Sequence, residues 1–433
     1  MIDPSSYSRR RAELAALMRD GVAIVRTAPE RARNRDSSYP FRFDSYFHYL
    51  SGFPEPESVL VLVAGSEPKS ILFCREKDTE REIWDGFRYG PAEARQTFGF
   101  DEAHPVAKLN DLLPQLLANQ PTLFCDVGAD PAWDSQVIGW INQVRAQVRA
   151  GVSAPGEIRD IRRLLDDMRL IKDGQEIATM RRAARISAEA HRRAMRLARP
   201  GRREYELEAE LIHEFRRQGA QSPAYTPIVA SGANACILHY VQNDAAIADG
   251  ELVLIDAGCE LDGYASDITR TFPVNGKFSG PQRDIYQLVL RAQTAAIAQV
   301  KPGNTWDAPH HAAVRELAQG MIDLGLCKGS ADGVMESGDY RRFYMHRTGH
   351  WLGMDVHDAG DYKRDGVWIK LAAGMMLTVE PGCYVRPAPD VPEQFWNIGV
   401  RIEDDALVTD AGCDIISADA PKDLDEIESL MRG

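Results

Sequence analysis

The chain has 433 residues, of which 44% are hydrophobic and 27% are charged. This length exceeds what one hydrophobic core usually supports, so we expect two domains. The formal net charge of −13 at pH 7 excludes nucleic acid and anionic membrane surfaces as expected partners, because both carry negative charge.

Neither the N-terminus nor the cysteines indicate an exported or membrane-bound protein. Residues 1–11 are not followed by an apolar signal core, and the longest apolar runs have the length of strands rather than of membrane spans. The seven cysteines include no Cys-x-x-Cys spacing, and several lie inside apolar runs, which favours buried free thiols over disulfides. We therefore expect a cytoplasmic protein with no membrane partner.

The first part of the chain predicts a small α/β domain. An amphipathic helix is expected over residues 6–19, with Ser5 or Ser6 as its cap. Short apolar runs then predict strands that alternate with helical segments, with strands over 21–25, 58–63, 70–74 and 122–126 and helices over 106–118 and 133–149. The character of the sequence changes near residue 168, so we expect one domain over 1–168 and a second over 169–433.

The second part predicts two helices followed by a hairpin, and then the same order again, which hints at internal duplication. The expected helices cover 175–198, 203–219, 281–299 and 307–324. The expected strands cover 225–232, 235–240, 370–384 and 397–408. His239 falls on one of these strands, and the Gly/His-rich residues 344–358 are expected to be irregular chain.

Two carboxylates flank a further predicted hairpin. The apolar run 251–255 predicts a buried strand that ends at Asp256, and residues 264–274 alternate well enough for the returning strand. Asp267 is therefore expected on the partner strand. For an isolated pair of acids near a turn, solvated turn residues are the ordinary alternative, because a buried carboxylate is costly without a countercharge.

Three later segments each place a ligand-type side chain where a charge is unfavourable. His350 lies in the irregular stretch, Glu380 ends an apolar run, and Glu403 is flanked by apolar residues. Each alone has an ordinary explanation as a core histidine or a salt-bridged glutamate. Together with the hairpin they would bring four carboxylates to one pocket, and these cannot all stay ionised without compensating cations. Two divalent ions would balance the four charges, so we expect a dinuclear metal site with the histidine as a neutral donor.

The segments around these residues resemble the pita-bread metallopeptidases, which include prolidase and methionine aminopeptidase, and most closely the aminopeptidase P (Xaa-Pro aminopeptidase) group. The matching segments are 256–276, 350–358, 378–382 and 399–405, with 36–40, 47–53 and 81–84 in the N-terminal half. The resemblance thus spans nearly the whole chain. It implies an α+β architecture, in which a creatinase-like α/β N-terminal domain precedes a pita-bread catalytic domain, and a homo-oligomer, either a dimer or a tetramer.

By this resemblance the five metal ligands fall on Asp256, Asp267, His350, Glu380 and Glu403. Asp267 and Glu403 would bridge the two ions, Asp256 would hold one ion, and His350 with Glu380 the other. Mostly oxygen ligation favours Mn²⁺ over Zn²⁺, with Zn²⁺, Co²⁺ and Mg²⁺ as alternatives in preparations. The implied mechanism is attack of a metal-bridging hydroxide on the scissile carbonyl, with Glu380 taking the water proton.

The resemblance also implies catalytic and substrate-binding histidines. His357 is expected near the scissile carbonyl oxygen, and His239 near the residue that follows the cleaved bond. His346 is a third catalytic candidate, on a variable stretch of chain. The other histidines have no motif context and are expected to be structural or solvated; they are His48, His104, His191, His213, His310 and His311.

The remaining implied site residues surround the ligands or the proline pocket. Tyr384 and Arg401, with Asp36 from the N-terminal domain, are expected to form hydrogen bonds that orient the ligands. For Arg401, charge compensation beside Glu403 is the alternative. Tyr225 is expected in the pocket wall, and Trp84 is expected to reach the proline pocket of a neighbouring subunit.

The expected activity is release of the N-terminal residue from peptides with proline at the second position. An Xaa-Pro bond has a tertiary nitrogen and a fixed φ, so its cleavage needs a shaped pocket. The nearest alternative is a prolidase, which shares the ligands but cuts only Xaa-Pro dipeptides. A metal-free binding protein or creatinase-like relative is the remote alternative, and the presence of all five ligand residues argues against it.

Overall fold

The computed structural model describes residues 3–432, and the chain separates into two compact units, Met1–Met168 and Arg169–Gly433. Each unit has a hydrophobic core of its own. The expectation of free thiols is confirmed, since all seven cysteines are free and only Cys413 is not fully buried. Within the described residues, no helix has both the length and the apolar character needed to span a membrane.

Residues 3–168 form one six-stranded mixed sheet with the order β4-β3-β2-β1-β5-β6. Its strands are β1 (Gly21–Arg26), β2 (Val59–Ala64), β3 (Lys69–Cys74), β4 (Glu102–Pro105), β5 (Thr122–Cys125) and β6 (Glu157–Asp160). The four strands expected from apolar runs are confirmed. The other two, β4 and β6, were not expected because their residues are half-buried or exposed and show no apolar pattern.

This unit also contains helices before, between and after the strands. They are α1 (Pro4–Met18), α2 (Ser45–Ser51), α3 (Thr79–Asp85), α4 (Gly90–Phe98), α5 (Leu109–Leu117), α6 (Pro131–Arg145) and α7 (Arg162–Leu170), the last of which runs across the boundary between the units. The cap expected for the first helix is wrong. Asp3 caps α1, because its side chain accepts a hydrogen bond from the Ser5 amide at 2.9 Å and Pro4 suits the first helical position.

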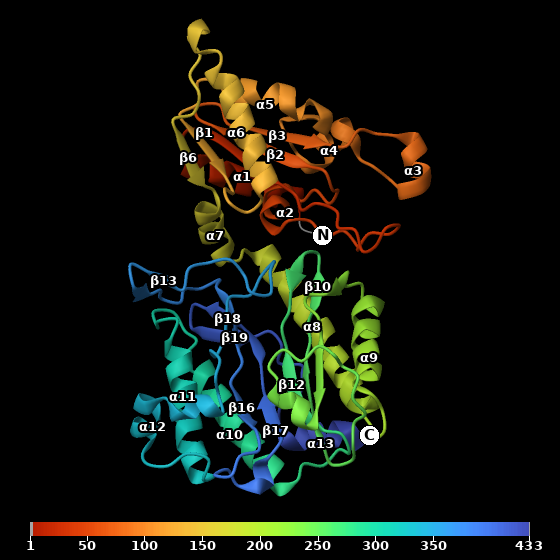
Figure 1. Cartoon of the computed structure of the whole chain (residues 1–433), viewed down its shortest axis with the longest axis vertical. Coiled ribbons are helices and arrows are strands. Elements are labelled where there is room, and N and C mark those ends of the chain that lie inside the picture. Colours follow the sequence, from red (N-terminus) through yellow and green to blue (C-terminus); the bar gives the residue numbers. More distant parts are fainter. Residues whose placement is uncertain (1–2, 433) are drawn as a thin grey trace. The chain divides into compact units, whose positions relative to one another are not determined.

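In the second unit two pairs of helices flank a set of strands (Figure 1). The paired helices are α8 (Gly174–Leu197) with α9 (Glu204–Arg217), and α10 (Gly280–Ile297) with α11 (Ala308–Asp323). The short helix α12 (Ala331–Ser337) and the last helix α13 (Leu424–Arg432) complete the described set. The four long helices were all expected, because each has an apolar face and ends near a glycine or proline.

The strands of the second unit pair locally into small sheets. The first group is β7 (Ser222–Pro223), β8 (Ile228–Ser231), β9 (Leu252–Asp256), β10 (Cys259–Leu261), β11 (Tyr264–Ala265) and β12 (Thr269–Pro273). The second group is β13 (Lys363–Arg364), β14 (Val367–Trp368), β15 (Met376–Val379), β16 (Gly382–Val385), β17 (Ile398–Arg401), β18 (Asp404–Thr409) and β19 (Gly412–Ile415). Their sheets have the orders β12-β9-β8, β11-β10-β7, β15-β18-β19 and β16-β17, with β13-β14 as a separate hairpin.

The hairpin after Asp256 differs from the expectation. The returning chain forms the separate hairpin β10–β11 before β12 pairs with β9, so Asp267 lies in the connection and the prediction that it is on the partner strand is wrong. A Cβ atom at Gly258 would lie 1.7 Å from the carbonyl oxygen of Ser266, so the two chains cross there in contact. The Asp267 amide then donates to the Asp405 carboxylate at 3.2 Å instead of to a strand.

Three other expected strands are also wrong in part. Residues 235–240 do not form a strand, because Gly232 turns the chain at φ +52 into a 3-10 helix and His239 follows in a turn. Each long strand expected after residue 370 is two strands with a break. Glu380 lies in the break between β15 and β16, and Glu403 in the break between β17 and β18. Since β15 pairs with β18 and β16 with β17, the two breaks face each other.

Candidate active site

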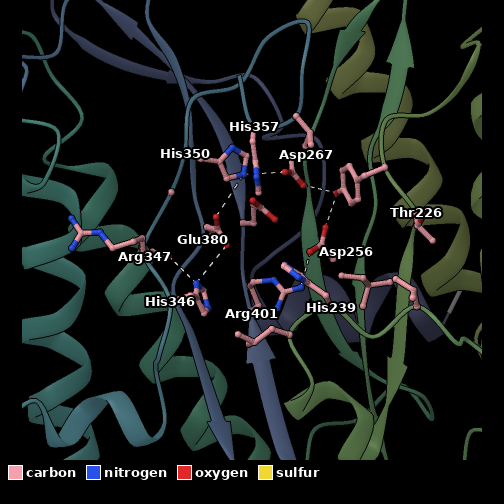
Figure 2. A pocket seen from close by; sticks show the side chains of 17 residues that line it. Thr226, His239, Asp256, Asp267, His346, Arg347, His350, His357, Glu380 and Arg401 are labelled. Atoms are coloured by element: carbon pink, nitrogen blue, oxygen red, sulfur yellow. Dashed lines mark hydrogen bonds and ion pairs between the residues drawn. The ribbon is translucent and has the colours of Figure 1, made fainter. Parts of the chain in front are cut away.

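The five expected metal ligands line one cavity of about 470 Å³ in the second unit. Figure 2 shows the side chains of Asp256, Asp267, His350 and Glu380 pointing toward one another. They come from the end of β9, the connection before β12, the irregular chain before β15 and the break after it. Glu403, from the opposite break, lines the same cavity and is 2% exposed.

The ligand atoms lie within the range that one or two metal ions could join. Nε2 of His350 is 3.4 Å from Asp267 Oδ2 and 3.7 Å from Glu380 Oε1. Ligand atoms of Asp267, His350 and Glu403 all lie within 4.8 Å of one another. Nδ1 of His350 is 2.9 Å from the carbonyl oxygen of Trp351. When Nδ1 donates to this carbonyl, the electron pair of Nε2 faces the carboxylates, as metal-ligating histidines require.

The electrostatics of the cluster fit a site for divalent cations. Burial, with repulsion from neighbouring carboxylates, raises the pKa of Asp267, that of Glu380 to about 7 and that of Glu403 far above its usual value. Burial alone would lower the pKa of His350, but the hydrogen bond to Asp267 and the charge of Glu380 raise it to about 9. Four carboxylates and one imidazole therefore offer a donor set whose charge is unbalanced, and hard divalent ions prefer such oxygen-rich sets.

Backbone hydrogen bonds fix the positions of three of these ligands. The Glu403 amide donates to the Thr269 carbonyl at 3.1 Å, and the Glu380 amide donates to the Thr348 carbonyl at 2.9 Å. The Asp267 amide is bound by the Asp405 carboxylate, as described above. Each of these bonds joins one ligand-bearing segment to another segment of the cavity wall.

A hydrogen-bonded chain leads from Asp256 to His346. The guanidinium of Arg401 donates to Asp256 Oδ2 at 2.6 Å and to the Tyr384 hydroxyl at 3.0 Å. That hydroxyl lies 2.8 Å from Nε2 of His346, and burial lowers the pKa of this histidine to about 4. Arg401 thus forms its ion pair with Asp256 and not with Glu403. Thr269 lies between Arg401 and Glu403 and donates to Glu403 Oε2 at 2.6 Å, but the charge of Arg401 still lowers the pKa of Glu403, so charge compensation remains an alternative explanation for Arg401.

Tyr225 contacts the cluster more directly than expected for a wall residue. Its hydroxyl lies 2.6 Å from Asp256 Oδ1 and also hydrogen-bonds Asp267 Oδ1. The aromatic ring lines the same cavity. The tyrosine therefore spaces the two hairpin carboxylates.

The two histidines expected to contact the substrate lie at the rim. His239 and His357 line the cavity and are exposed. The ring of His357 is 4.2 Å from that of His350, measured between centroids. Apolar side chains line the same cavity, namely Ile228, Leu238, Val241 and Val356.

Two expected site residues belong to the first unit. Asp36 and Trp84 are exposed there, Trp84 by 82%. Their expected roles toward the ligands and the proline pocket stay predictions.

Several residues with structural roles at the site were not expected. Asp405 binds the amide of Asp267, and Thr269 links Arg401 to Glu403. A second group of charges lies beside them, because Asp404 pairs with Arg270 at 2.7 Å and with Lys422 at 2.5 Å. Polar residues that interrupt the buried strands β12 and β18 were the available signal, but the same pattern also fits edge residues.

Comparison with known proteins agrees with this geometry. The description "Metallopeptidase family M24" matches residues 178–410, and "Aminopeptidase P, N-terminal domain" matches residues 7–124. The Xaa-Pro aminopeptidase of Haemophilus influenzae is 45% identical over 427 residues, which cover 98% of this chain and 96% of that protein. The solved structure of Pseudomonas aeruginosa aminopeptidase PepP has 50% identity and a TM-score of 0.98, and the match covers 100% of this chain and 98% of that one.

The aminopeptidase P from Escherichia coli with the inhibitor Pro-Leu has 44% identity and a TM-score of 0.97, over 100% of this chain and 98% of that one. The chain therefore belongs to metallopeptidase family M24 and, within that family, to the aminopeptidase P group of pita-bread enzymes. The expected architecture of an aminopeptidase P N-terminal domain followed by a pita-bread domain is confirmed.

Proposed function

We propose that this metallopeptidase removes the N-terminal residue from peptides whose second residue is proline. The observation that carries the proposal is the convergence of four carboxylates and one histidine in the cavity of the unit matched by family M24. The named activity of the Haemophilus influenzae relative supports the substrate class. The E. coli enzyme was solved with Pro-Leu as inhibitor, and Pro-Leu is what remains of an Xaa-Pro-Leu tripeptide after its first residue has been released.

Two divalent cations are proposed as the cofactor, with Mn²⁺ favoured by the oxygen-rich donor set. Asp256, Asp267, His350, Glu380 and Glu403 would hold them. When bound, the ions would lower the pKa of a water molecule and polarise the peptide carbonyl.

The side chains around the ligands would orient the substrate and move the proton. Glu380 is proposed to accept the proton of the attacking water and pass it to the proline nitrogen, because its carboxylate lies 3.7 Å from both His350 and His346. His357, at the rim, is proposed to donate to the carbonyl oxygen as its negative charge develops. Arg401 and Tyr384 would hold Asp256 and His346 in fixed positions through the chain of hydrogen bonds between them.

We further propose a homo-oligomer, a dimer or a tetramer, in which Trp84 reaches the proline pocket of a neighbouring copy. The 82% exposure of Trp84, beside Ile83 at 81% on the short helix α3, supports a role outside its own unit. Asp36 is proposed to belong to the hydrogen-bonded group around the ligands. The domain boundary near residue 168 is proposed to separate this supporting part from the catalytic part. Light scattering of the purified protein measures the number of copies.

The function is tested by assaying Xaa-Pro-Yaa tripeptides beside Xaa-Pro dipeptides and Xaa-Ala-Yaa tripeptides. We expect free Xaa and the dipeptide Pro-Yaa from the first substrate, identified by mass spectrometry, and loss of this product after chelation with recovery on adding Mn²⁺. Cleavage of the dipeptide alone would establish the prolidase alternative. Equal cleavage of the alanine peptide would contradict the requirement for proline.

A further inference from the structure

The carboxylate of Glu204, the first residue of α9, is fully buried and accepts hydrogen bonds from five donors. Oε1 accepts from the Ser231 amide at 2.7 Å, the Ser231 hydroxyl at 2.8 Å and the Asn234 side chain at 3.1 Å. Oε2 accepts from the Tyr240 hydroxyl at 2.8 Å and the Ala245 amide at 3.0 Å. All five donors are uncharged, so their dipoles and the start of the helix stabilise the buried negative charge.

The five donors lie on both sides of His239. Two of the residues precede it, at the end of β8 and in the 3-10 helix Gly232–Cys236, and the other two follow it. The chain between them has no strand partner over 237–240. Glu204 therefore ties together the two ends of a segment, residues 231–245, whose middle carries one of the proposed substrate-side histidines.

Other contacts hold the base of this segment but not its tip. The buried Asn243 accepts from the Val229 amide at 2.9 Å and donates to the Pro227 carbonyl at 2.9 Å. At the other end, Arg386 donates to the Cys236 carbonyl at 2.7 Å. Tyr240 directly follows His239, and its hydroxyl, which also lies 3.5 Å from Asp244 Oδ1, joins this part of the segment to Glu204 at 2.8 Å.

We propose that Glu204 is a positioning residue that sets the place of His239 at the rim of the active site. The inference rests on the proposed function, which gives His239 its contact with the substrate. Since the histidine is exposed on a turn, its freedom to move is limited by how firmly the two ends of the segment are joined. A loosened segment would misplace the imidazole, and a displacement of about 1 Å can cost roughly 100-fold in rate.

Two variants weaken the tie by different amounts. Tyr240→Phe removes one hydroxyl and keeps the ring in the cluster with Ile228 and Tyr384. Glu204→Gln keeps an acceptor for the Ser231 side but presents an NH₂ group toward the Ala245 amide, so two donors face each other. The matched control is Tyr286→Phe, because the Tyr286 side chain is also buried and its hydroxyl donates to the Lys422 carbonyl at 2.8 Å, away from the cavity lining.

The kinetic arm measures kcat/KM for an Xaa-Pro-Yaa tripeptide, for each variant alone and combined with His239→Ala. We expect Tyr240→Phe and Glu204→Gln each to lower kcat/KM by roughly 10- to 100-fold, and Tyr286→Phe to leave it unchanged. In the His239→Ala background the same two changes should have no further effect, because their action passes through the missing imidazole. Effects that simply multiply would overturn the proposal and assign Glu204 a purely structural role.

The second arm measures amide hydrogen exchange of the metal-free protein and needs no activity. We expect faster exchange confined to residues 231–245 in Tyr240→Phe and Glu204→Gln, with α10 unchanged and no change in the Tyr286→Phe control. Unchanged exchange in residues 231–245 would contradict the inference that Glu204 holds this segment together. A wild-type protein that cleaves no Xaa-Pro-Yaa would refute the proposed function instead, while this arm would still show whether Glu204 holds the segment.

Discussion

Two groups of buried carboxylates lie next to each other, and consecutive residues belong to different groups. Asp404 is fully buried between Arg270 and Lys422. Burial would raise the pKa of Asp404, but these two cations hold it below the usual value. Glu403, one residue earlier, points into the cluster with Asp267 and Glu380, and burial with their repulsion raises its pKa far above the usual value.

The difference lies in where the countercharge comes from. For Asp404 the chain supplies both cations, so the assembly is complete when the protein folds. For the cluster around Glu403 the chain supplies too little positive charge, since the guanidinium of Arg401 is engaged by Asp256. A buried site with unbalanced charge is suited to bind ions from solution, and a balanced one is suited to hold the fold together.

The largest expected effect follows from removing one acid of the unbalanced cluster. Glu403→Gln should lower kcat/KM by about 1000-fold or more, because a proposed metal ligand is lost and several kcal/mol of charge stabilisation go with it. The metal-free variant should nevertheless unfold at a higher urea concentration than metal-free wild type, because the folded state no longer buries an acid whose pKa it raises. Full activity would contradict the metal site, and reduced stability would contradict the unbalanced charge.

Removing a charge from the group around Asp404 should instead destabilise the folded protein. Arg270→Met should cost roughly 3–5 kcal/mol in the free energy of unfolding, because it leaves the Asp404 carboxylate buried without its main partner. Lys422→Met is the control and should cost less, since the lysine side chain is 29% exposed and solvent can replace it. Urea denaturation of both variants measures the difference. Equal losses would mean that burial does not decide the contribution of each pair.

Metal binding should distinguish the two groups of carboxylates, with an effect of intermediate size on stability. Adding Mn²⁺ at 100 times its dissociation constant should stabilise the wild type by about 2.7 kcal/mol through binding to the folded state alone. Glu403→Gln should show a much smaller gain, whereas Arg270→Met should keep it despite its lower starting stability. Thermal unfolding with and without a chelator measures these shifts. Loss of the gain in Arg270→Met would show that the two groups are coupled.

The smallest expected effect concerns a buried group that the fold keeps neutral. His310 lies 2.8 Å from the Thr348 hydroxyl, and burial lowers its pKa from 6.5 to about 3. Between these values the unfolded chain binds a proton that the folded chain does not, so stability is lost as pH falls below 6.5. In His310→Asn this dependence should become shallower by up to about 1.4 kcal/mol per pH unit. Urea denaturation at pH 4.5, 5.5 and 6.5 checks it, and an unchanged slope would contradict a neutral His310.

The ligand-type residues of the site could be found from the sequence because each is a charge in an apolar setting. Glu380 and Glu403 interrupt runs of Val, Ile and Met, and such interruptions are costly without a function. The resemblance to a known family then selected them from other acids. Their placement in breaks between strands was not predictable from the sequence. It depends on Pro381 and on how the strands on either side of the facing break pair.

Other features depend on contacts between distant segments. The position of Asp267 off its strand requires the crossing at Gly258, and the turn at His239 requires the backbone conformation of Gly232. Glu204 has the sequence pattern of an ordinary acid in the first turn of a helix. Its burial follows only when residues 231–245 fold over it. Likewise, side chains from other elements decide which of the two adjacent acids, Glu403 or Asp404, is paired with cations of the chain.

The amides of Glu380 and Glu403 bind carbonyl oxygens of neighbouring segments, and these bonds do not use the carboxylate oxygens of either residue. Under the proposed function, the ions would then be bound by a site whose backbone is already folded. An ion could be stripped out and a different one inserted without denaturing the enzyme. Supply in the cell and the intrinsic affinity order of divalent ions would then decide which metal is carried, and purified samples could differ in metal content while sharing one fold.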